Sequence, residues 1–390
     1  MSDDNHIRAG GEKTNVGISI APLAALIFGH AVADGCINFI PAMWPVFQEQ
    51  LGLTASQIGK LTGAVSVTTN FGQPLFGYLA DRWRVPRMEA FGPIIVGLFV
   101  GLMGQTETLW LFGLLYVMAG IGTAMFHPEG ATLAARVSGS ALGCAAAGPV
   151  AVYLYQRLDM TGMMGATVIG AAAGILLLTV KVGRRYNDQN HEPLRLRRDV
   201  LPHLHRVSTL FAVVTLRAIV IVAFVTFIAL QVKSWGGGLE VGARVLFLMI
   251  FCGGLGNILG GFLSDHIGRR AITVVSLIAC APFLVAFIHY GLPMGYALAA
   301  IAGFLAQMSV SVNIVQAQEL LPAGPGIASS LTMGASWGVA GLSMPVVGWA
   351  ADTYGLAATL MWLPALMVVA GALAIAIPDK AGEAVDRAGA

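Results

Sequence analysis

Long apolar segments run through the whole sequence and constrain its fold more than any other feature. A helix needs about 20 predominantly apolar residues to cross the hydrocarbon core of a bilayer. Hydrophobic residues make up 56% of the 390 residues and charged residues only 11%, whereas a soluble protein carries about 25% charged residues. The segments are too long for the strands of a membrane barrel and lack their two-residue alternation. We therefore expect an all-α protein that crosses the membrane many times.

Twelve segments qualify as membrane-spanning helices. They cover residues 20–47, 56–80, 90–104, 109–137, 140–155, 160–182, 207–232, 241–263, 271–288, 296–320, 326–350 and 356–377. Thr54 and Gln57 have the spacing of a capping box, which predicts the start of the second helix. The fifth segment barely reaches crossing length, and the first half of the chain is shorter than the second around this segment. Trp44 and Trp362 fall near segment ends, which predicts contacts with the membrane interface.

The distribution of Lys and Arg predicts the orientation, because cytoplasmic segments of membrane proteins are enriched in both. With the N-terminus inside, 17 of the 22 Lys and Arg residues fall in cytoplasmic segments, four fall outside and Arg217 lies within a span. We expect a cytoplasmic tail, a six-helix bundle, a basic cytoplasmic linker, a second six-helix bundle and a second cytoplasmic tail. These parts cover residues 1–19, 20–182, 183–206, 207–377 and 378–390, respectively. The chain is predicted to be a monomeric, multi-pass protein of the cell inner (plasma) membrane, in contact with lipid and with both termini cytoplasmic.

One short motif occurs once in each half, directly after the second and the eighth segment. The stretches "GYLADRWRVPR" and "GFLSDHIGRR" place Asp81 and Asp265 184 residues apart. Glycine permits a close approach of helices, and an aspartate at the membrane edge can accept from a helix N-terminus or an arginine. Such contacts can break and form again when two bundles rock against each other. We predict a gating role for Gly77, Asp81, Arg82, Gly261, Asp265, Gly268, Arg269 and Arg270.

Both loops resemble the G-x-L-a-D-r-x-G-r-r signature of the major facilitator superfamily, although Arg84 stands at the second glycine of the first loop. Four further stretches resemble exporters of the fosmidomycin-resistance type: "FGHAVADG", "FHPEGATLA", "LRAIVIVAF" and "QELLP". The resemblance covers essentially the whole chain. It implies the major facilitator fold, in which two pseudo-symmetric six-helix bundles surround a central cavity and transport proceeds by alternating access.

Four ionisable residues interrupt apolar segments of the first half. His30 and Asp34 are four residues apart and therefore share a helix face, and a histidine beside a carboxylate can exchange a proton near neutral pH. His127 and Glu129 flank Pro128, which bends a helix because it lacks a backbone donor. Ionisable groups inside a span are functional candidates. We predict that all four bind substrate or couple protons, and a structural polar network remains the alternative.

Arg217 is the matching feature of the second half. The 184-residue offset carries Asp34 to position 218, so that Arg217 is nearly its repeat equivalent. Opposite charges on two related helices predict either a salt bridge between the bundles or an arginine clamp on an anion. Asn313 and Gln316 add polar groups to the same half and complete the predicted substrate site.

These features favour a secondary active transporter. We expect proton-coupled efflux of a small drug or metabolite, and the resemblance implies an anionic, phosphonate-like one. The alternative is a divalent-metal or small organic anion transporter that works in either direction, because histidine and carboxylate side chains also suit divalent ions. The sequence carries no nucleophile motif, phosphate loop or cofactor fingerprint. We therefore expect no enzyme activity, no cofactor, no resident metal and no nucleic-acid partner.

Overall fold

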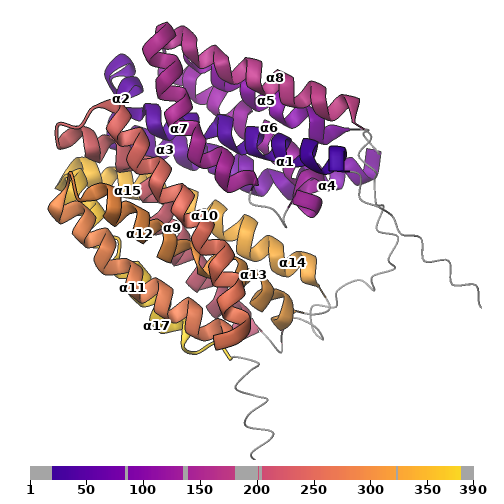
Figure 1. Ribbon diagram of the computed structural model, residues 1–390, viewed down its shortest axis with the longest axis vertical. Coiled ribbons are helices and arrows are strands. Elements are labelled where there is room, and N and C mark those ends of the chain that lie inside the picture. Colours follow the sequence, from indigo (N-terminus) through magenta and orange to yellow (C-terminus); the bar gives the residue numbers. More distant parts are fainter. Residues whose placement is uncertain are drawn as a thin grey trace, which may run out of the picture.

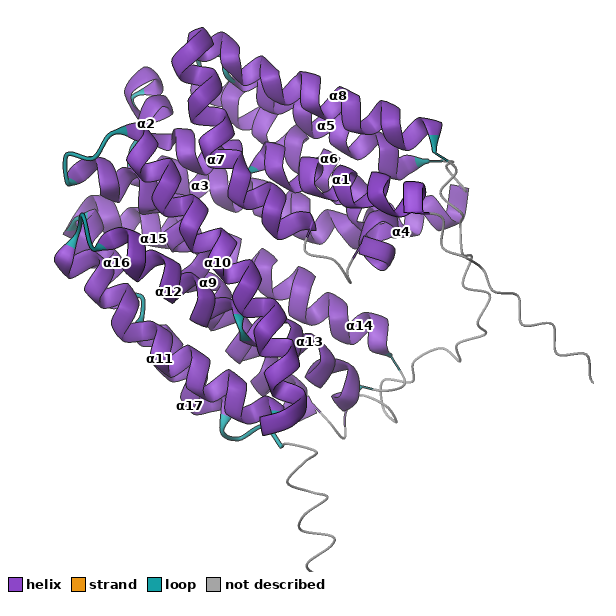
Figure 2. Ribbon diagram, viewed as in Figure 1, coloured by secondary structure: helices purple, strands orange, loops and turns teal. Residues whose placement is uncertain are grey.

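The computed structural model describes residues 20–83, 87–134, 139–180, 201, 204–321 and 324–378. Helices account for nearly all of these residues, and no strand occurs among them (Figure 2). The all-α class is therefore confirmed. Most of the predicted linker and both predicted tails lie outside the described residues.

The described residues of the first half form eight α-helices, one π-helix and one 3-10 helix. They are α1 (Ile20–Ile37), α2 (Phe39–Leu51), α3 (Ala55–Ser66), the π-helix η1 (Val67–Phe71), α4 (Gly72–Trp83), α5 (Met88–Met103), α6 (Leu109–Ala134), α7 (Gly139–Leu158), the 3-10 helix η2 (Asp159–Met163) and α8 (Met164–Thr179). The capping box at the start of α3 is formed as predicted: the Thr54 hydroxyl accepts from the Gln57 amide, and the Gln57 side chain accepts from the Thr54 amide.

The second half of the chain is also helical, but its helices break in different passes. It contains α9 (Leu204–Ser234), α10 (Leu239–Ile267), α11 (Arg269–Tyr290), α12 (Gly295–Gln307), α13 (Ser309–Leu320), α14 (Pro325–Ser329), the π-helix η5 (Ser330–Ala335), α15 (Ser336–Tyr354), α16 (Leu356–Trp362) and α17 (Ala365–Ala374).

Helices that follow one another without a reversal of the chain combine into twelve passes within the described residues. The combined passes are α1–α2, α3–η1–α4, α12–α13, α14–η5–α15 and α16–α17, and each remaining α-helix is one pass. By length and composition alone, eight described helical stretches could cross a membrane. These stretches cover nine of the twelve passes. The other three are α5, which is shorter, and the second and eleventh passes, each of which carries a π-helical turn.

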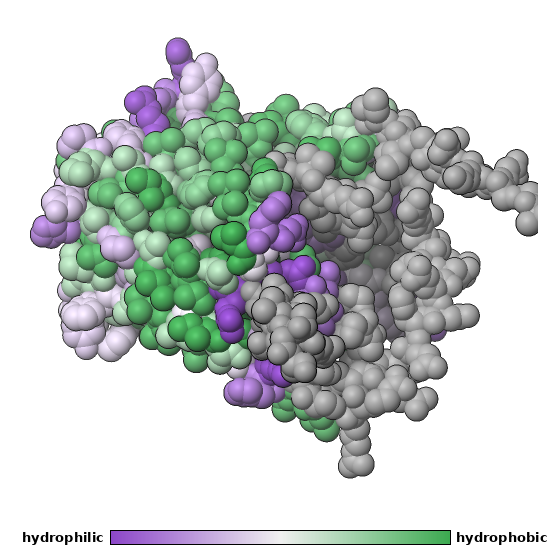
Figure 3. Space-filling model, turned by 60° about the horizontal axis from the view of Figure 1, so that its bottom comes forward, coloured by the Kyte–Doolittle hydropathy of each residue, from purple (hydrophilic) through white to green (hydrophobic). Residues whose placement is uncertain are grey.

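The passes group into two bundles, which Figure 1 shows in indigo to magenta and in red to yellow. Contacts within the first bundle are densest between α5 and its neighbours α6 and α8, and those within the second between α10 and α12. The bundles meet mainly where α3 packs on α15 and where α7 packs on α10. On the face shown in Figure 3, most of the described surface is apolar, as a lipid-facing surface requires. The prediction of two pseudo-symmetric six-helix bundles is confirmed.

The fifth pass is shorter than its counterpart in the second half, as the sequence predicted. Helix α7 has 20 residues, whereas the eleventh pass extends over residues 325–354. At 1.5 Å per residue, α7 is about 30 Å long and still matches the hydrocarbon core. The length of α7 agrees with that of α15 alone, and the described residues of the first half contain no counterpart of α14 and η5.

Candidate functional site

Asp34 lies at the centre of a polar cluster inside the first bundle. The His30 Nε2 atom is 3.2 Å from Asp34 Oδ2, and the His127 Nε2 atom is 3.2 Å from Asp34 Oδ1. The structure therefore brings together three of the predicted residues, from α1 and α6. Asp34 and His30 are each 8% exposed. A carboxylate this deeply buried requires close hydrogen-bond donors, and the two imidazoles supply them.

Ser140 and Asn38 extend this cluster toward α7. The Ser140 hydroxyl donates a hydrogen bond to Asp34 Oδ2. The Asn38 amide donates to the Asp34 backbone carbonyl at 2.7 Å and contacts the Cys144 sulfur at 3.3 Å. The Asp34 carboxylate is thus contacted by side chains from three helices: His30 and Ser140 contact Oδ2, and His127 contacts Oδ1. Neither Ser140 nor Asn38 was predicted from the sequence.

Close packing of α1 and α7 places these groups next to each other. A Cβ atom added at Gly143 would lie 2.0 Å from the Ala31 carbonyl oxygen, and one added at Gly35 would lie 3.1 Å from the Gly143 carbonyl oxygen. Only glycine permits this approach of two backbones. The His30 ring also packs edge-on against His127, with ring centroids 5.3 Å apart. The orientation of the cluster is therefore fixed by packing as well as by hydrogen bonds.

The same cluster has the composition of a cation site. The ligand atoms of His30, Asp34 and His127 lie within 4.8 Å of one another, and no other group of three such residues occurs in the described part of the chain. Imidazole and carboxylate ligands suit zinc and neighbouring divalent ions. The arrangement can therefore hold either protons or a divalent cation, and we return to this choice below.

Arg217 lies in the second bundle and is 1% exposed. Its Nη1 atom donates to Gln307 Oε1 at 2.9 Å, and its guanidinium carbon lies 5.9 Å from the centre of the Trp337 ring. Its Nε atom has no hydrogen-bond partner among the described residues. No described carboxylate forms an ion pair with it. A buried guanidinium with spare donors is suited to an anionic ligand.

Asn313 and Gln316 lie on α13, in the same pass as Gln307. Thr273 donates to Asn313 Oδ1 at 3.0 Å, so Asn313 links α11 to α13 inside the second bundle. Gln316 is 4% exposed, and its Oε1 atom has no partner among the described residues. Among the described residues, neither side chain forms a hydrogen bond with Arg217.

The sequence predicted that Arg217 would pair either with Asp34 or with an anionic ligand. Among the described residues, Arg217 and Asp34 form no ion pair. Asp34 instead pairs with the two histidines of its own bundle. The Glu129 side chain, also predicted for this site, lies outside the described residues. Two separate polar groups result, one around Asp34 in the first bundle and one around Arg217 in the second.

The first predicted gating loop is described only in part. Gly77 is half-buried on α4, and Arg82 is exposed. The Asp81 side chain lies outside the described residues.

The second gating loop joins α10 to α11. Asp265 is exposed. Gly268 has a φ of 93°, a conformation that favours glycine, and it ends α10. The Arg269 guanidinium forms an ion pair with Glu319 on α13, within the second bundle. Gly261 is half-buried and Arg270 is exposed.

An additional aspartate joins the two bundles at the opposite end of the molecule. The Asp352 carboxylate, on α15, accepts from the backbone amides of Ala55 at 2.9 Å and Ser56 at 2.8 Å. These amides form the N-terminus of α3, where free donors and the helix dipole favour an anion. Lys233 forms a second contact between the bundles, with its Nζ atom 2.7 Å from Glu49 Oε1.

Asp352 was not predicted, yet the sequence contains a signal for it. The stretch "GWAADTYG" places Asp352 four residues after Gly348, the spacing of Gly77 to Asp81 and of Gly261 to Asp265. The spacing of glycine and aspartate in the gating motif therefore occurs a third time, without the leucine and the arginines. No comparable signal marks Gln307 or Trp337, the two contacts of Arg217.

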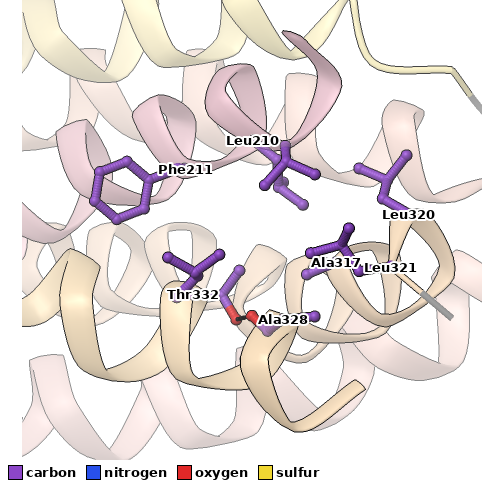
Figure 4. Close-up of a pocket in the computed structure, with 9 residues that line it drawn as sticks. Leu210, Phe211, Ala317, Leu320, Leu321, Ala328 and Thr332 are labelled. Carbon is purple, nitrogen blue, oxygen red and sulfur yellow. Dashed lines mark hydrogen bonds between the residues drawn. The ribbon is translucent and has the colours of Figure 1, made fainter. Parts of the chain in front are cut away.

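A small apolar recess lies between α9, α13 and η5 in the second bundle (Figure 4). Its lining consists of Val207, Leu210, Phe211, Ala317, Leu320, Leu321, Ala328, Leu331 and Thr332. The Thr332 hydroxyl donates to the carbonyls of its own helix at Ala328 and Ser329. The recess contains no charged side chain, and it includes none of the predicted site residues.

Comparisons with known proteins agree with this architecture. Residues 23–342 match the Major Facilitator Superfamily profile. The chain is 26% identical to the fosmidomycin resistance protein of Escherichia coli (strain K12), over 95% of this chain and 96% of that protein. It is 25% identical to the MFS-type transporter YfnC of Bacillus subtilis (strain 168), over 93% and 94% of the two chains.

Solved structures show the same fold at low sequence identity. A variant of the nucleoside transporter NupG superposes with a TM-score of 0.76 at 12% identity, over 92% of this chain and 99% of that one. A bacterial homologue of the human lysosomal transporter Spinster gives a TM-score of 0.71 at 16% identity, over 90% and 95%. These proteins are membrane transporters and not enzymes. The chain belongs to the major facilitator superfamily of membrane transporters.

Proposed function

We propose that the protein exports a small anionic compound in exchange for protons. The observation that carries this proposal is the separation of two buried polar groups. Asp34 is held by His30 and His127 in one bundle, while Arg217 forms no ion pair with any described carboxylate in the other. The first group is suited to take up and release protons, and the second to bind an anion.

Alternating access couples the two groups. When the two bundles rock, each group faces one side of the membrane and then the other. Exchange requires that the two ligands be carried in alternate halves of the cycle: the anion on Arg217 while Asp34 is deprotonated, and the proton on the Asp34 cluster while Arg217 is free of substrate. Binding of one ligand must therefore disfavour binding of the other by a few kcal/mol, which is a sufficient bias for a transporter with two states.

The contacts between the bundles support an inward-facing state. The seam formed by α3 and α15, with the Asp352 cap and the Lys233–Glu49 pair, lies at the end predicted to be extracellular. The described residues of α4 and α13, at the other end, share no comparable contacts. Two relatives are named for resistance, the fosmidomycin resistance protein and the multidrug resistance protein MdtG, which is 24% identical over 68% of this chain. Removal of a compound from the cell would produce resistance, and this supports export as the proposed direction.

A substrate-induced proton flux tests the proposal. Fosmidomycin is the probe, because a relative is named for resistance to it. Protein in liposomes with an internal pH dye is exposed to fosmidomycin without a preset pH gradient. We expect protons to leave the side to which the drug moves. Drug movement without any proton movement would contradict the proposed coupling.

The His30–Asp34–His127 cluster favours a second candidate, transport of a divalent cation as the substrate. The same liposomes distinguish the two candidates. Uptake of zinc or cobalt that saturates, and that His127→Ala abolishes, would favour cation transport. Proton flux that depends on fosmidomycin and not on either ion favours anion export.

A further inference from the structure

Each bundle joins the buried charge of its first pass to a side chain of its fourth pass. In the first bundle, Asp34 on α1 contacts His127 on α6. In the second bundle, Arg217 on α9 donates to Gln307 at the end of α12. The histidine can carry a charge of its own, whereas the glutamine is a neutral amide. Gln307 therefore accepts a hydrogen bond from Arg217 without cancelling its positive charge.

Gln307 occupies only one side of the Arg217 guanidinium. Among the described residues, Nη1 is the only Arg217 nitrogen that donates a hydrogen bond. Nε and Nη2 lie side by side on another edge of the planar group, and their two parallel N–H bonds match the two oxygens of a carboxylate or phosphonate. Trp337 packs on the guanidinium, with its ring centre 5.9 Å from the guanidinium carbon. The Nε–Nη2 edge is thus the part of Arg217 that is available to an oxyanion.

Close packing of α10 on α12 sets the position of Gln307. A Cβ atom added at Gly253, on α10, would lie 2.9 Å from Gln307 Cγ and 3.2 Å from the Gly303 carbonyl oxygen. One added at Gly303, on α12, would lie 2.0 Å from the Met249 carbonyl oxygen. Glycine at both positions permits the two backbones to approach each other. The Gln307 side chain therefore lies against the backbone of Gly253, which restricts its movement beside Arg217.

We propose that Gln307 is a positioning residue for Arg217: it holds the guanidinium so that the Nε–Nη2 edge stays free to bind the two oxygens of a phosphonate or carboxylate side-on. This rests on the proposed role of Arg217 as the anion site. A fixed guanidinium loses less conformational freedom when the ligand binds, which strengthens binding. A neutral acceptor is required at position 307, because a carboxylate there would form an ion pair with Arg217 and compete with the ligand.

Thermal unfolding of the full chain in detergent tests the proposal. The melting temperature is measured at neutral pH with fosmidomycin, with methylphosphonate, and with chloride at matched ionic strength as the reference. A ligand that binds only the folded protein stabilises it, and the dependence on ligand concentration gives an apparent Kd. We expect both fosmidomycin and methylphosphonate to raise the melting temperature of the wild-type protein above its value in chloride.

Two substitutions separate positioning from a structural role. Gln307→Glu gives Arg217 a charged partner, so the melting temperature without ligand should rise by a few degrees, while the apparent Kd should rise about a hundredfold. Gln307→Met keeps the length of the side chain but removes the amide. It should lower the melting temperature and raise the apparent Kd roughly tenfold. A residue with only a structural role would change stability and affinity in the same direction in both variants.

Gln105→Glu is the matched control, because it makes the same change of charge at an exposed position of the first bundle, where Gln105 donates to the Met160 carbonyl. Its apparent Kd should equal that of the wild type. If Gln307→Met does not fold, Gln307→Asn replaces it, and the shorter amide should give a smaller rise in Kd. Wild-type affinity in Gln307→Glu, a loss of both stability and affinity in Gln307→Glu, or an equal loss of affinity in Gln105→Glu would overturn the proposal.

The outcome also separates this inference from the proposed function. Binding that depends on Gln307, combined with fosmidomycin transport that moves no protons, would reject the coupling and retain the positioning role. Coupled transport with an affinity that neither substitution of Gln307 changes would reject the positioning role alone. The absence of stabilisation by both fosmidomycin and methylphosphonate would reject both.

Discussion

Asp34 and Arg217 occupy nearly equivalent positions in the first helices of the two bundles, yet each is held by its own bundle. Asp34 contacts His30 and His127, and Arg217 contacts Gln307 and Trp337. A direct salt bridge would have locked the bundles together. Two separate charges instead allow a proton and an anion to bind on opposite sides of the interface, which is the basis of the predictions that follow.

Arg217→Lys should weaken binding of an anionic substrate. Lysine keeps the charge but loses the planar donor group that contacts Gln307 and packs on Trp337. Loss of one charged hydrogen bond predicts roughly a tenfold higher KM for fosmidomycin. Transport kinetics in liposomes measure this, with Lys233→Arg, at a contact remote from Arg217, as the control. An unchanged KM would show that Arg217 does not contact the anion.

Asp352→Ala should loosen the seam between α3 and α15. The substitution removes the acceptor for the amides of Ala55 and Ser56, and the loss of such a cap costs about 1 kcal/mol. Because the contact exists only while this end is closed, the population open at this end should rise about fivefold. Labelling of a cysteine placed at Ser56 reports the opening.

Asp352→Asn is the matched variant for this experiment, because asparagine also caps helices well. It should label nearly as slowly as the wild-type protein. Equal labelling of the alanine variant and the wild type would show that the cap does not hold the seam closed.

Gly143→Ala should destabilise the first bundle. The new Cβ atom would lie 2.0 Å from the Ala31 carbonyl oxygen, so α1 and α7 would have to separate. We expect a loss of about 1–3 kcal/mol, typical of overpacking. Thermal unfolding in detergent measures it. Gly113→Ala is the control, because its Cβ atom would meet only the flexible end of Leu61, at 3.1 Å; equal melting temperatures for the two variants would refute the packing argument.

Asp265→Asn should slow transport while the protein still folds and inserts. Asp265 is exposed at the end of α10, so the change removes charge without disturbing a packed core. If its contacts form only in another state of the cycle, the rate should fall several-fold. Initial rates of transport, normalised to the amount of protein, check this. A normal rate would leave Asp265 as a determinant of topology alone.

Much of the fold could be predicted from the sequence, because the length of each apolar segment indicates a membrane-spanning helix and the positions of Lys and Arg indicate its orientation. The start of α3 at its capping box is one example. Details within passes were not predictable. The first pass runs on to Leu51 and breaks at Asn38, so Trp44 lies two turns inside its end. Trp44 is therefore fully buried against Phe112 and Tyr116 rather than at the membrane interface, and that prediction was wrong.

The candidate site shows the same limit. The spacing of His30 and Asp34 fixes a shared face within one helix, and the structure contains this pair. Which side chains of other helices meet that face depends on the rotation and depth of each helix, and these follow from packing between residues distant in the sequence. For this reason the contact of Ser140 with Asp34 was missed, and a salt bridge of Asp34 with Arg217 was among the expectations.

Asp34→Asn in liposomes tests the central claim most directly. The neutral amide resembles a permanently protonated Asp34, so exchange of labelled for unlabelled fosmidomycin should continue at a reduced rate. Accumulation of the drug driven by a pH gradient should be lost, because the variant cannot release its proton. Full accumulation with the pH dependence of the wild-type protein would contradict the account and make the His30–Asp34–His127 cluster a structural one.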